Sequence, residues 1–218
     1  MLMLNTRILH LIAVTISAAS LSHAGTVLST TSFTGANNTG ALVSGPTWYA
    51  VGLETGASSV DFTSLSGYFN NSNTQSTATF GGGIYSESSA HPGTLLAAFV
   101  SQSLNAATLS TLLTFATAST YTLNASTDYW FVIDPVGSPF WEATALSGAS
   151  APTAISGYTF LGFRSTSNSG TSWTTGTSNP TVKIDVADAV ATPEPSSLAL
   201  LMVGGSALLA GLGAKRVS

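Results

Sequence analysis

Cysteine is absent from this 218-residue sequence, and charged residues are rare. Without a thiol, the chain can form neither a disulfide framework nor a thiolate site in any compartment. Charged residues make up 6% of the sequence, whereas globular proteins ordinarily contain about 25%. This scarcity argues against a long exposed coiled coil, which needs charged residues beside its hydrophobic seam.

Basic residues are especially few. Five lysines and arginines face nine acidic residues, which leaves a formal net charge of -4 at pH 7. A nucleic-acid-binding protein needs a basic surface that neutralises phosphates, so nucleic acid is not an expected partner. Disorder driven by excess charge is also disfavoured, because 44% of the residues are hydrophobic and can form a core.

Histidine is equally scarce outside the ends of the chain. Of the three histidines, only His91 lies beyond the first 24 residues, so a HExxH helix or a histidine-rich metal site is excluded. A Ser-His-Asp triad would depend on His91, and no G-x-S-x-G motif accompanies it. Calcium loops of the D-x-[DN]-x-[DN]-G type are also missing. We expect no metal, no cofactor and no enzymatic activity.

The N-terminal segment 1–24 has the pattern of a secretory signal peptide. Arg7 is its only charged residue, an apolar stretch runs from Ile8 to Leu21, and small residues follow at Ser22 and Ala24. This arrangement predicts export and cleavage after Ala24. The alternative, a buried helix of a globular domain, is disfavoured by the terminal position and by the flanking residues.

The C-terminal segment 193–218 has three successive parts: Pro193-Glu194-Pro195, an apolar stretch over 198–214, and the basic pair Lys215-Arg216. A helix over the apolar stretch would be about 25 Å long, slightly less than the roughly 30 Å hydrocarbon core of a membrane. The basic pair is expected to stop the chain and hold its end in the cytoplasm. A simple membrane anchor and a GPI-type signal are the alternatives, although the latter would need a polar spacer.

The order of these three parts resembles the PEP-CTERM sorting signal of Gram-negative bacteria. A three-residue match alone would carry little information, but the combination over residues 193–218 is specific. The resemblance implies that an intramembrane exosortase recognises Pro193-Glu194-Pro195, after the secretion machinery has exported the chain. The transmembrane helix would then hold the protein in the membrane only transiently. The tail departs from the family pattern in having only two basic residues.

The central segment 25–192 is patterned as β-strands. Thr181 to Val186 alternates apolar and polar residues, which predicts a half-buried strand. Val60 to Phe69 changes parity near Ser64, which predicts a β-bulge. Tyr129 to Ile133 is apolar at both parities and predicts a central strand covered on both faces. Further strands are predicted at Thr26–Ser32, Trp48–Leu53, Thr77–Ile84, Leu95–Val100, Leu112–Ala116, Phe140–Ala145 and Tyr158–Arg164.

Turn residues separate these strands at short intervals. Pro92-Gly93 fits a type II turn, and Gly81-Gly82-Gly83 indicates a bulge or close strand packing. Leu104 to Leu113 is the one helical candidate. We therefore predict an all-β domain over residues 25–192, an antiparallel, jelly-roll-like β-sandwich, flanked by the signal peptide and the sorting helix. A domain of this length buries about 70% of its unfolded surface, which is enough for stability without disulfides.

A looser resemblance covers roughly Trp48 to Val186. The runs that carry it are Gly83-Ile84-Tyr85-Ser86, Pro92 to Leu96, and Thr127 to Ile133 with Leu123 before it. Together they are similar to the choice-of-anchor R type of bacterial surface domain. That resemblance implies a surface-exposed domain whose anchor differs from member to member, and it transfers no catalytic residue.

Aromatic residues in loops suggest binding to glycans. Trp141 and Trp173 lie in predicted loops, and indole faces can stack on sugar rings. The simpler interpretation is packing in the core or at an edge, because tryptophan is usually largely buried. Paired carboxylates for glycoside hydrolysis could come from Glu87, Asp134 and Glu142, although acidic residues on a sandwich are more simply explained by solubility.

These patterns predict an exported, exosortase-processed protein with a structural or exopolysaccharide-associated role. Its expected location is the inner membrane during processing, and then the cell surface or extracellular matrix of a Gram-negative bacterium. The alternative is a secreted carbohydrate-binding or carbohydrate-active, glycosidase-like protein that uses Asp134 or Glu142.

Overall fold

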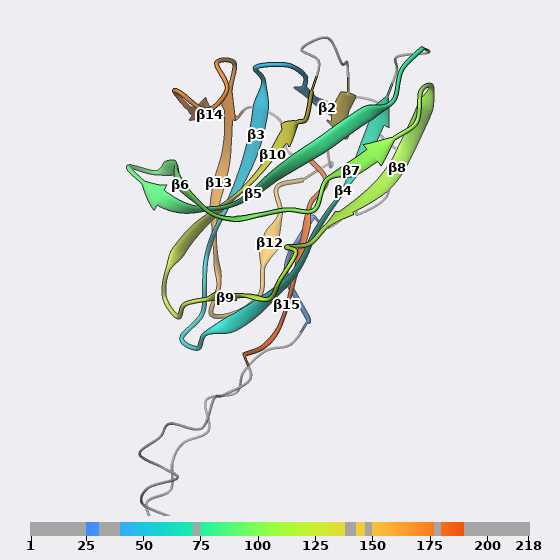
Figure 1. Ribbon diagram of the computed structural model, residues 1–218. Helices are drawn as coiled ribbons and strands as arrows, with labels where there is room; N and C mark the ends of the chain where they lie inside the picture. The colour runs from blue at the N-terminus through green and yellow to red at the C-terminus, as the bar shows by residue number, and fades with distance from the viewer. Residues whose placement is uncertain are drawn as a thin grey trace, which may run out of the picture.

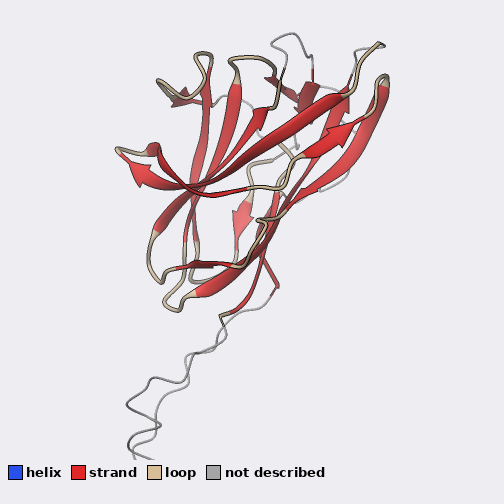
Figure 2. Cartoon of the chain, in the orientation of Figure 1, coloured by secondary structure: helices blue, strands red, loops and turns tan. Residues whose placement is uncertain are grey.

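A computed structural model describes residues 25–30, 40–71, 75–137, 143–146, 150–176 and 180–189. These residues form two antiparallel β-sheets that pack together as a β-sandwich (Figure 1). No helix occurs in these ranges (Figure 2). The predicted all-β sandwich is therefore confirmed, and the described strands all lie inside the predicted domain 25–192.

Eight strands form the first sheet, which we call sheet 1. They are β1 (Gly25–Ser29), β2 (Gly40–Val43), β4 (Val60–Asn71), β8 (Thr108–Phe115), β9 (Tyr121–Leu123), β11 (Ala143–Leu146), β12 (Thr153–Ala154) and β15 (Lys183–Asp188). Seven strands form sheet 2. They are β3 (Trp48–Glu54), β5 (Ala78–Ser88), β6 (His91–Ala98), β7 (Gln102–Leu104), β10 (Asp128–Pro135), β13 (Thr159–Thr166) and β14 (Thr174–Thr175).

Most neighbouring strands are far apart in the sequence. Sheet 1 has the order β12-β1-β15-β4-β11-β2, with β8 and β9 also paired with β4. Sheet 2 has the order β14-β13-β3-β10-β5-β6, with β7 also paired with β5. The first and last strands pair with each other, because Gly25 lies opposite Val186. β1 therefore begins beside the place where β15 ends (Figure 1).

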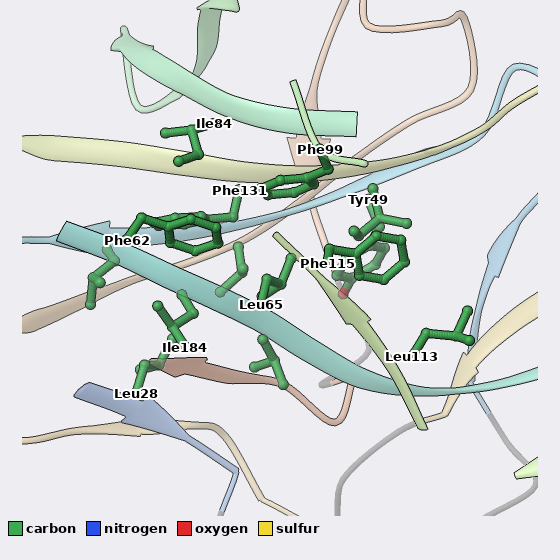
Figure 3. Close-up of a cluster of buried hydrophobic side chains, with 14 of the residues drawn as sticks. Leu28, Tyr49, Phe62, Leu65, Ile84, Phe99, Leu113, Phe115, Phe131 and Ile184 are labelled. Carbon is green, nitrogen blue, oxygen red and sulfur yellow. The ribbon is translucent and has the colours of Figure 1, made fainter. Parts of the chain in front are cut away.

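Aromatic side chains fill the space between the sheets (Figure 3). Phe131 of β10 and Phe62 of β4 stack across the sandwich with their ring centroids 5.4 Å apart, and Phe99 lies 5.6 Å from Phe62. Phe115 of β8 is completely buried. Since burying one such ring contributes about 1.5–3 kcal/mol, this aromatic core is a main source of the domain's stability.

The strand predictions with the clearest periodicity are confirmed. Val182, Ile184 and Val186 are all buried in the core. On β4 the register against β15 shifts between Phe62 and Ser64, which is the predicted bulge. The bulge allows apolar residues of both parities to face the core.

The turn predicted at Pro92-Gly93 is wrong. Both residues lie within β6, and the chain turns earlier, at Ser89 and Ala90, whose φ angles are 53° and 62°. The carboxylate of Glu87 accepts a hydrogen bond from the Ala90 N–H and stabilises the turn at this position. A proline is tolerated in β6 because this strand lies at the edge of sheet 2.

The helix considered for Leu104 to Leu113 does not form. Its residues instead end β7 and make up most of β8. In β8, Leu113 and Phe115 are buried, whereas Leu109, Leu112 and Thr114 are exposed. Alternating burial against the core therefore outweighs the helical spacing of the leucines.

Asn71 links the two sheets at the end of β4. Its side chain is fully buried, and its amide nitrogen donates hydrogen bonds to the carbonyl oxygens of Ser76 (2.9 Å), Leu104 (3.1 Å) and Asn105 (3.1 Å). Leu104 ends β7 of sheet 2. One amide group thus ties the end of a sheet 1 strand to a sheet 2 strand.

We predict that Asn71→Asp strongly destabilises the domain, because a carboxylate would face three carbonyl oxygens without solvent. The free energy of unfolding of the 25–192 fragment, measured in urea, is expected to fall by about 3 kcal/mol. Asn105→Asp is the control, since it keeps the accepting carbonyl and changes an exposed side chain. Equal losses for the two variants would contradict the role given to Asn71.

Candidate functional site

The two outer faces of the sandwich differ in chemistry. On sheet 1, Thr26 donates a hydrogen bond to Asp185 (2.6 Å), and Lys183 forms an ion pair with the same carboxylate (2.8 Å). Burial alone would raise the pKa of Asp185, but the hydrogen bonds from Lys183 and Thr26 lower it overall. This face is polar. The outer face of sheet 2 instead carries a second apolar cluster, which makes it the candidate functional surface.

We call this second cluster the Trp130 cluster. Its fully or almost fully buried members are Ala50, Trp130 and Val132, and the half-buried side chains packed against them are Trp48, Tyr85, Leu161 and Trp173. All seven come from sheet 2 or from the loop before β14. The main core lies on the other side of the same sheet, so the strands of sheet 2 separate two apolar clusters.

The register of sheet 2 places Trp130 in the centre of this face. Trp130 lies opposite Gly52 of β3 and Tyr85 of β5. A Cβ atom built on Gly52 would lie 2.9 Å from the indole ring and 2.8 Å from the Cβ of Leu161. Glycine is therefore required at this position, because any larger residue would push the indole away from the sheet.

The predicted close strand packing at Gly81-Gly82-Gly83 is confirmed. Gly82 has a φ of +114°, and a Cβ atom on it would lie 1.9 Å from the carbonyl oxygen of Val132. Only glycine adopts this conformation without strain. These residues belong to the part of β5 that packs closely against β10 before the chain continues into the β5–β6 hairpin.

Arg164 of β13 covers the indole ring of Trp130. Its guanidinium carbon lies 5.2 Å from the ring centroid, a cation–π arrangement. Its Nε donates a hydrogen bond of 2.7 Å to the carbonyl oxygen of Ala90. Ala90 belongs to the turn of the β5–β6 hairpin, although β3 and β10 separate β13 from β5 in the sheet. The hairpin therefore bends across the outer face and meets Arg164 above Trp130 (Figure 1).

The indole N–H of Trp130 is buried without a hydrogen-bond partner in the part of the chain that the structure describes. A buried donor left unsatisfied costs about 1–3 kcal/mol. Native proteins contain few such groups, and each needs an explanation. A purely structural role would be served as well by phenylalanine, which has no donor to satisfy.

An acidic groove adjoins the Trp130 cluster on the same strands. Asp128 lies opposite Glu54 of β3, and Glu87 lies two residues beyond Tyr85 on β5. The groove is open to solvent and has a volume of about 620 Å³, and its lining is completed by Ser86, Leu96, Tyr121, Asn124, Ser126, Thr127 and Tyr129. It combines carboxylate, hydroxyl and amide groups with one half-buried tyrosine ring.

Burial raises the pKa of Asp128, and the nearby charges of Glu54 and Glu87 raise it further. The three carboxylates therefore repel one another electrostatically, and a ligand that donates hydrogen bonds would relieve this repulsion. Among the described residues, no three histidine or acidic side chains are arranged to hold a metal ion. The groove thus has the chemistry for binding hydroxyl-bearing ligands.

Asp134 lies at the opposite end of the β10 outer face from Asp128. It pairs with Gly81, and burial raises its pKa to about 6. Glu87 lies six residues further along β5 than Gly81, which corresponds to about 20 Å. The carboxyl pair of a glycosidase is separated by about 5–9.5 Å. Asp134 and Glu87 therefore cannot act as such a pair, and Glu142 lies outside the described residues.

Of the two tryptophans predicted to contact glycans, the structure describes only Trp173. It is half-buried and packs against the Trp130 cluster, so it belongs to the candidate surface but is not a freely exposed platform. Trp141 lies outside the described residues, as do the predicted cleavage residue Ala24 and the sorting residues Pro193, Glu194, Pro195, Lys215 and Arg216. His91 is half-buried next to the hairpin turn, with its Nδ1 3.0 Å from the carbonyl oxygen of Pro92.

Sequence reasoning missed Trp130, Tyr85 and Arg164 as members of a surface site. The apolar run from Tyr129 to Ile133 correctly indicated a strand covered on both faces. It did not indicate that the outer cover consists of aromatic side chains and one arginine. Gly52 was the available signal, since a glycine opposite a tryptophan on a neighbouring strand marks a place where a large ring lies flat.

The remaining cavity of note lies between the sheets. Its volume is about 40 Å³, and it is lined mainly by core side chains such as Phe69, Phe115 and Phe131. Because these side chains hold the sheets together, we assign this space to the core. Within the described part of the chain there is no helix long and apolar enough to span a membrane.

The fold and the surface define a two-sheet antiparallel β-sandwich with a second aromatic cluster on one outer face. Comparisons of the chain with protein-family models, with curated proteins and with solved structures found no match. The function of the chain is therefore inferred from its own residues.

We predict that Asp134→Asn stabilises the domain at neutral pH. In the folded domain the pKa of Asp134 is about 6, above the ordinary value of 3.8. Burial favours the neutral carboxyl group, and this stabilising form is lost as the pH rises through 6. The variant keeps a neutral side chain, and its advantage should grow from near zero below pH 4 to about 1.5 kcal/mol at pH 7.5, after allowance for partial exposure.

Urea unfolding at several pH values measures this difference. Asp188→Asn, which removes one negative charge at an exposed position, is the matched control. A stability difference for Asp134→Asn that does not change with pH would contradict the burial of this carboxylate.

Proposed function

We propose that this chain is an exported cell-envelope protein that an exosortase processes and that then associates with extracellular polysaccharide in a structural role. The observation that carries this proposal is the C-terminal order of Pro193-Glu194-Pro195, an apolar segment over 198–214 and Lys215-Arg216. In this proposal, residues 1–24 direct secretion, residues 25–192 form a jelly-roll-like sandwich, and residues 193–218 hold the chain in the inner membrane until processing.

The charge of the central domain supports this assignment. Between residues 25 and 192 the sequence has two basic residues, Arg164 and Lys183, and eight acidic ones, which gives a formal charge of -6. Such a domain repels nucleic acids and other polyanions. A neutral matrix polymer is therefore a more suitable partner than an anionic one.

A second candidate function is glycoside hydrolysis. The observation in its favour is that Asp128 lies beside Glu54 and Glu87 on neighbouring strands, in a groove, with a raised pKa. Carboxyl groups on paired strands lie near the separation that retaining glycosidases use. These carboxylates differ from Asp134 and Glu142, which the sequence offered for the glycosidase-like alternative.

We predict that Glu194→Ala blocks sorting. If an exosortase recognises the Pro-Glu-Pro motif, the variant should accumulate as an uncleaved, membrane-held form. Its release from producing cells should fall at least about tenfold. Immunoblots of membrane and medium fractions measure both forms. Ser197→Ala, a nearby substitution outside the Pro-Glu-Pro motif, is the control. Unchanged release of the Glu194→Ala chain would contradict the proposal.

A further inference from the structure

The Trp130 cluster contains a hydrogen-bond donor that no described residue satisfies. The Tyr85 hydroxyl is the one side-chain acceptor in the cluster, and it does not accept from this donor, so an acceptor must come from outside this set. Water is one source, and a ligand oxygen is another. The donor lies on the outer face of sheet 2, where a ligand can approach, and not between the sheets.

The cover above Trp130 is held by few interactions. Arg164 contributes its cation–π contact and the hydrogen bond to Ala90. The hairpin turn that supplies this carbonyl has Ser89 and Ala90 with positive φ angles, which favour glycine or asparagine. A turn of this kind stores backbone strain. Among the described residues, the hydrogen bond from Arg164 to Ala90 is the one that joins the hairpin tip to β13. Movement of Arg164 and the hairpin tip therefore uncovers the part of the indole ring that the guanidinium group covers.

The acidic groove continues the same surface. Asp128 precedes Trp130 by two residues on β10, and Glu87 follows Tyr85 by two residues on β5, so each pair lies on one face. An aromatic row is thus followed, about 7 Å along the strands, by a row of carboxylates. Sugar rings have an apolar face that stacks on aromatic side chains, and hydroxyl groups that donate to carboxylates.

The charges on this face select the kind of sugar. Glu54, Glu87, Asp128 and Asp134 provide four carboxylates, and Arg164 is the one cation among the residues described on this face. A polymer bearing carboxylate or sulfate groups would be repelled. A neutral polysaccharide meets no such repulsion and can donate hydrogen bonds to each carboxylate.

We propose that the outer face of sheet 2 binds a neutral polysaccharide chain, with sugar rings on the Trp130 cluster, hydroxyl groups in the acidic groove, and a sugar oxygen accepting from the indole N–H of Trp130 after Arg164 moves aside. This inference deepens the proposed polysaccharide association and rests on it for the class of partner. Polysaccharide binding by this face does not require the sorting step.

Binding is tested with the full chain purified in a detergent without a sugar headgroup. Affinity electrophoresis in gels containing soluble β-glucan, galactomannan or xylan measures retardation, and alginate and hyaluronan serve as anionic probes. We expect retardation by at least one neutral polymer and by neither anionic polymer. No retardation by any neutral polymer, or stronger retardation by the anionic polymers, overturns the inference.

Two variants test the named groups. Trp130→Phe keeps an aromatic ring and removes the N–H, and it should weaken binding about tenfold, the effect of losing one hydrogen bond of roughly 1.4 kcal/mol. Tyr68→Phe, in sheet 1, is the matched control and should leave binding unchanged. Equal binding by the wild-type and Trp130→Phe chains overturns the role of the indole.

Arg164→Ala distinguishes a binding face from a merely structural cluster. Removing the cover should strengthen binding about three- to tenfold, because the ligand no longer has to displace it. Asp128→Asn keeps the shape of the groove and should weaken binding. If Trp130→Phe fails to fold, these two variants still decide, since weaker binding by Arg164→Ala or unchanged binding by Asp128→Asn contradicts the inference.

Hydrolysis and sorting give separate outcomes. If the chain released reducing ends from the polymer, the face would be the site of an enzyme and not of a binding protein, and the inference would be overturned. A chain that is released normally in cells but binds no neutral polymer overturns the binding face and leaves exosortase sorting intact. A chain that binds the polymer but is released regardless of Glu194 overturns the sorting proposal alone.

Discussion

Burial of β10 on both of its faces is the constraint on which the rest of the structure depends. Tyr129, Phe131 and Ile133 enter the aromatic core between the sheets, whereas Trp130 and Val132 enter the second cluster. Its two edges pair with β3 and β5, and its two faces are covered by the aromatic core on one side and by the other members of the Trp130 cluster on the other. The unusual outer surface of sheet 2 is therefore a direct consequence of the same five-residue run that closes the main core.

Small residues on the flanking strands make this double burial possible. Gly52 leaves room for the indole ring, and Gly82 lets β5 approach the backbone of Val132. Sheet 1 has no corresponding apolar cluster on its described outer face, and its outward groups include the Thr26–Asp185–Lys183 network. The sandwich consequently has one solvated side and one side on which apolar groups, carboxylates and a single cation lie together.

Local alternation was enough to predict the sandwich and its central strands. Val182, Ile184 and Val186 repeat every second residue, and a period of two is a property of the strand alone. The position of the β5–β6 turn was not predictable from Pro92-Gly93, because the hydrogen bond from Ala90 to Glu87 and the edge position of β6 decide it. The candidate surface escaped prediction for a related reason: Trp48, Tyr85, Trp130 and Arg164 come from four strands, and only the sheet order brings them together.

The pairing of Gly25 with Val186 places both ends of the described domain at one end of the sandwich. Val60 lies opposite both Asp188 at the end of β15 and Leu123 at the end of β9, next to groove residue Asn124. The acidic groove and the end of β15 are thus at the same end of the molecule. If the chain is tethered beyond β15 while a polymer pulls on the groove, tension on Asn124 reaches β15 through β9 and β4. Tension on Glu54, Glu87 and Asp128 starts on β3, β5 and β10 instead, and it reaches β15 across the aromatic core between the sheets.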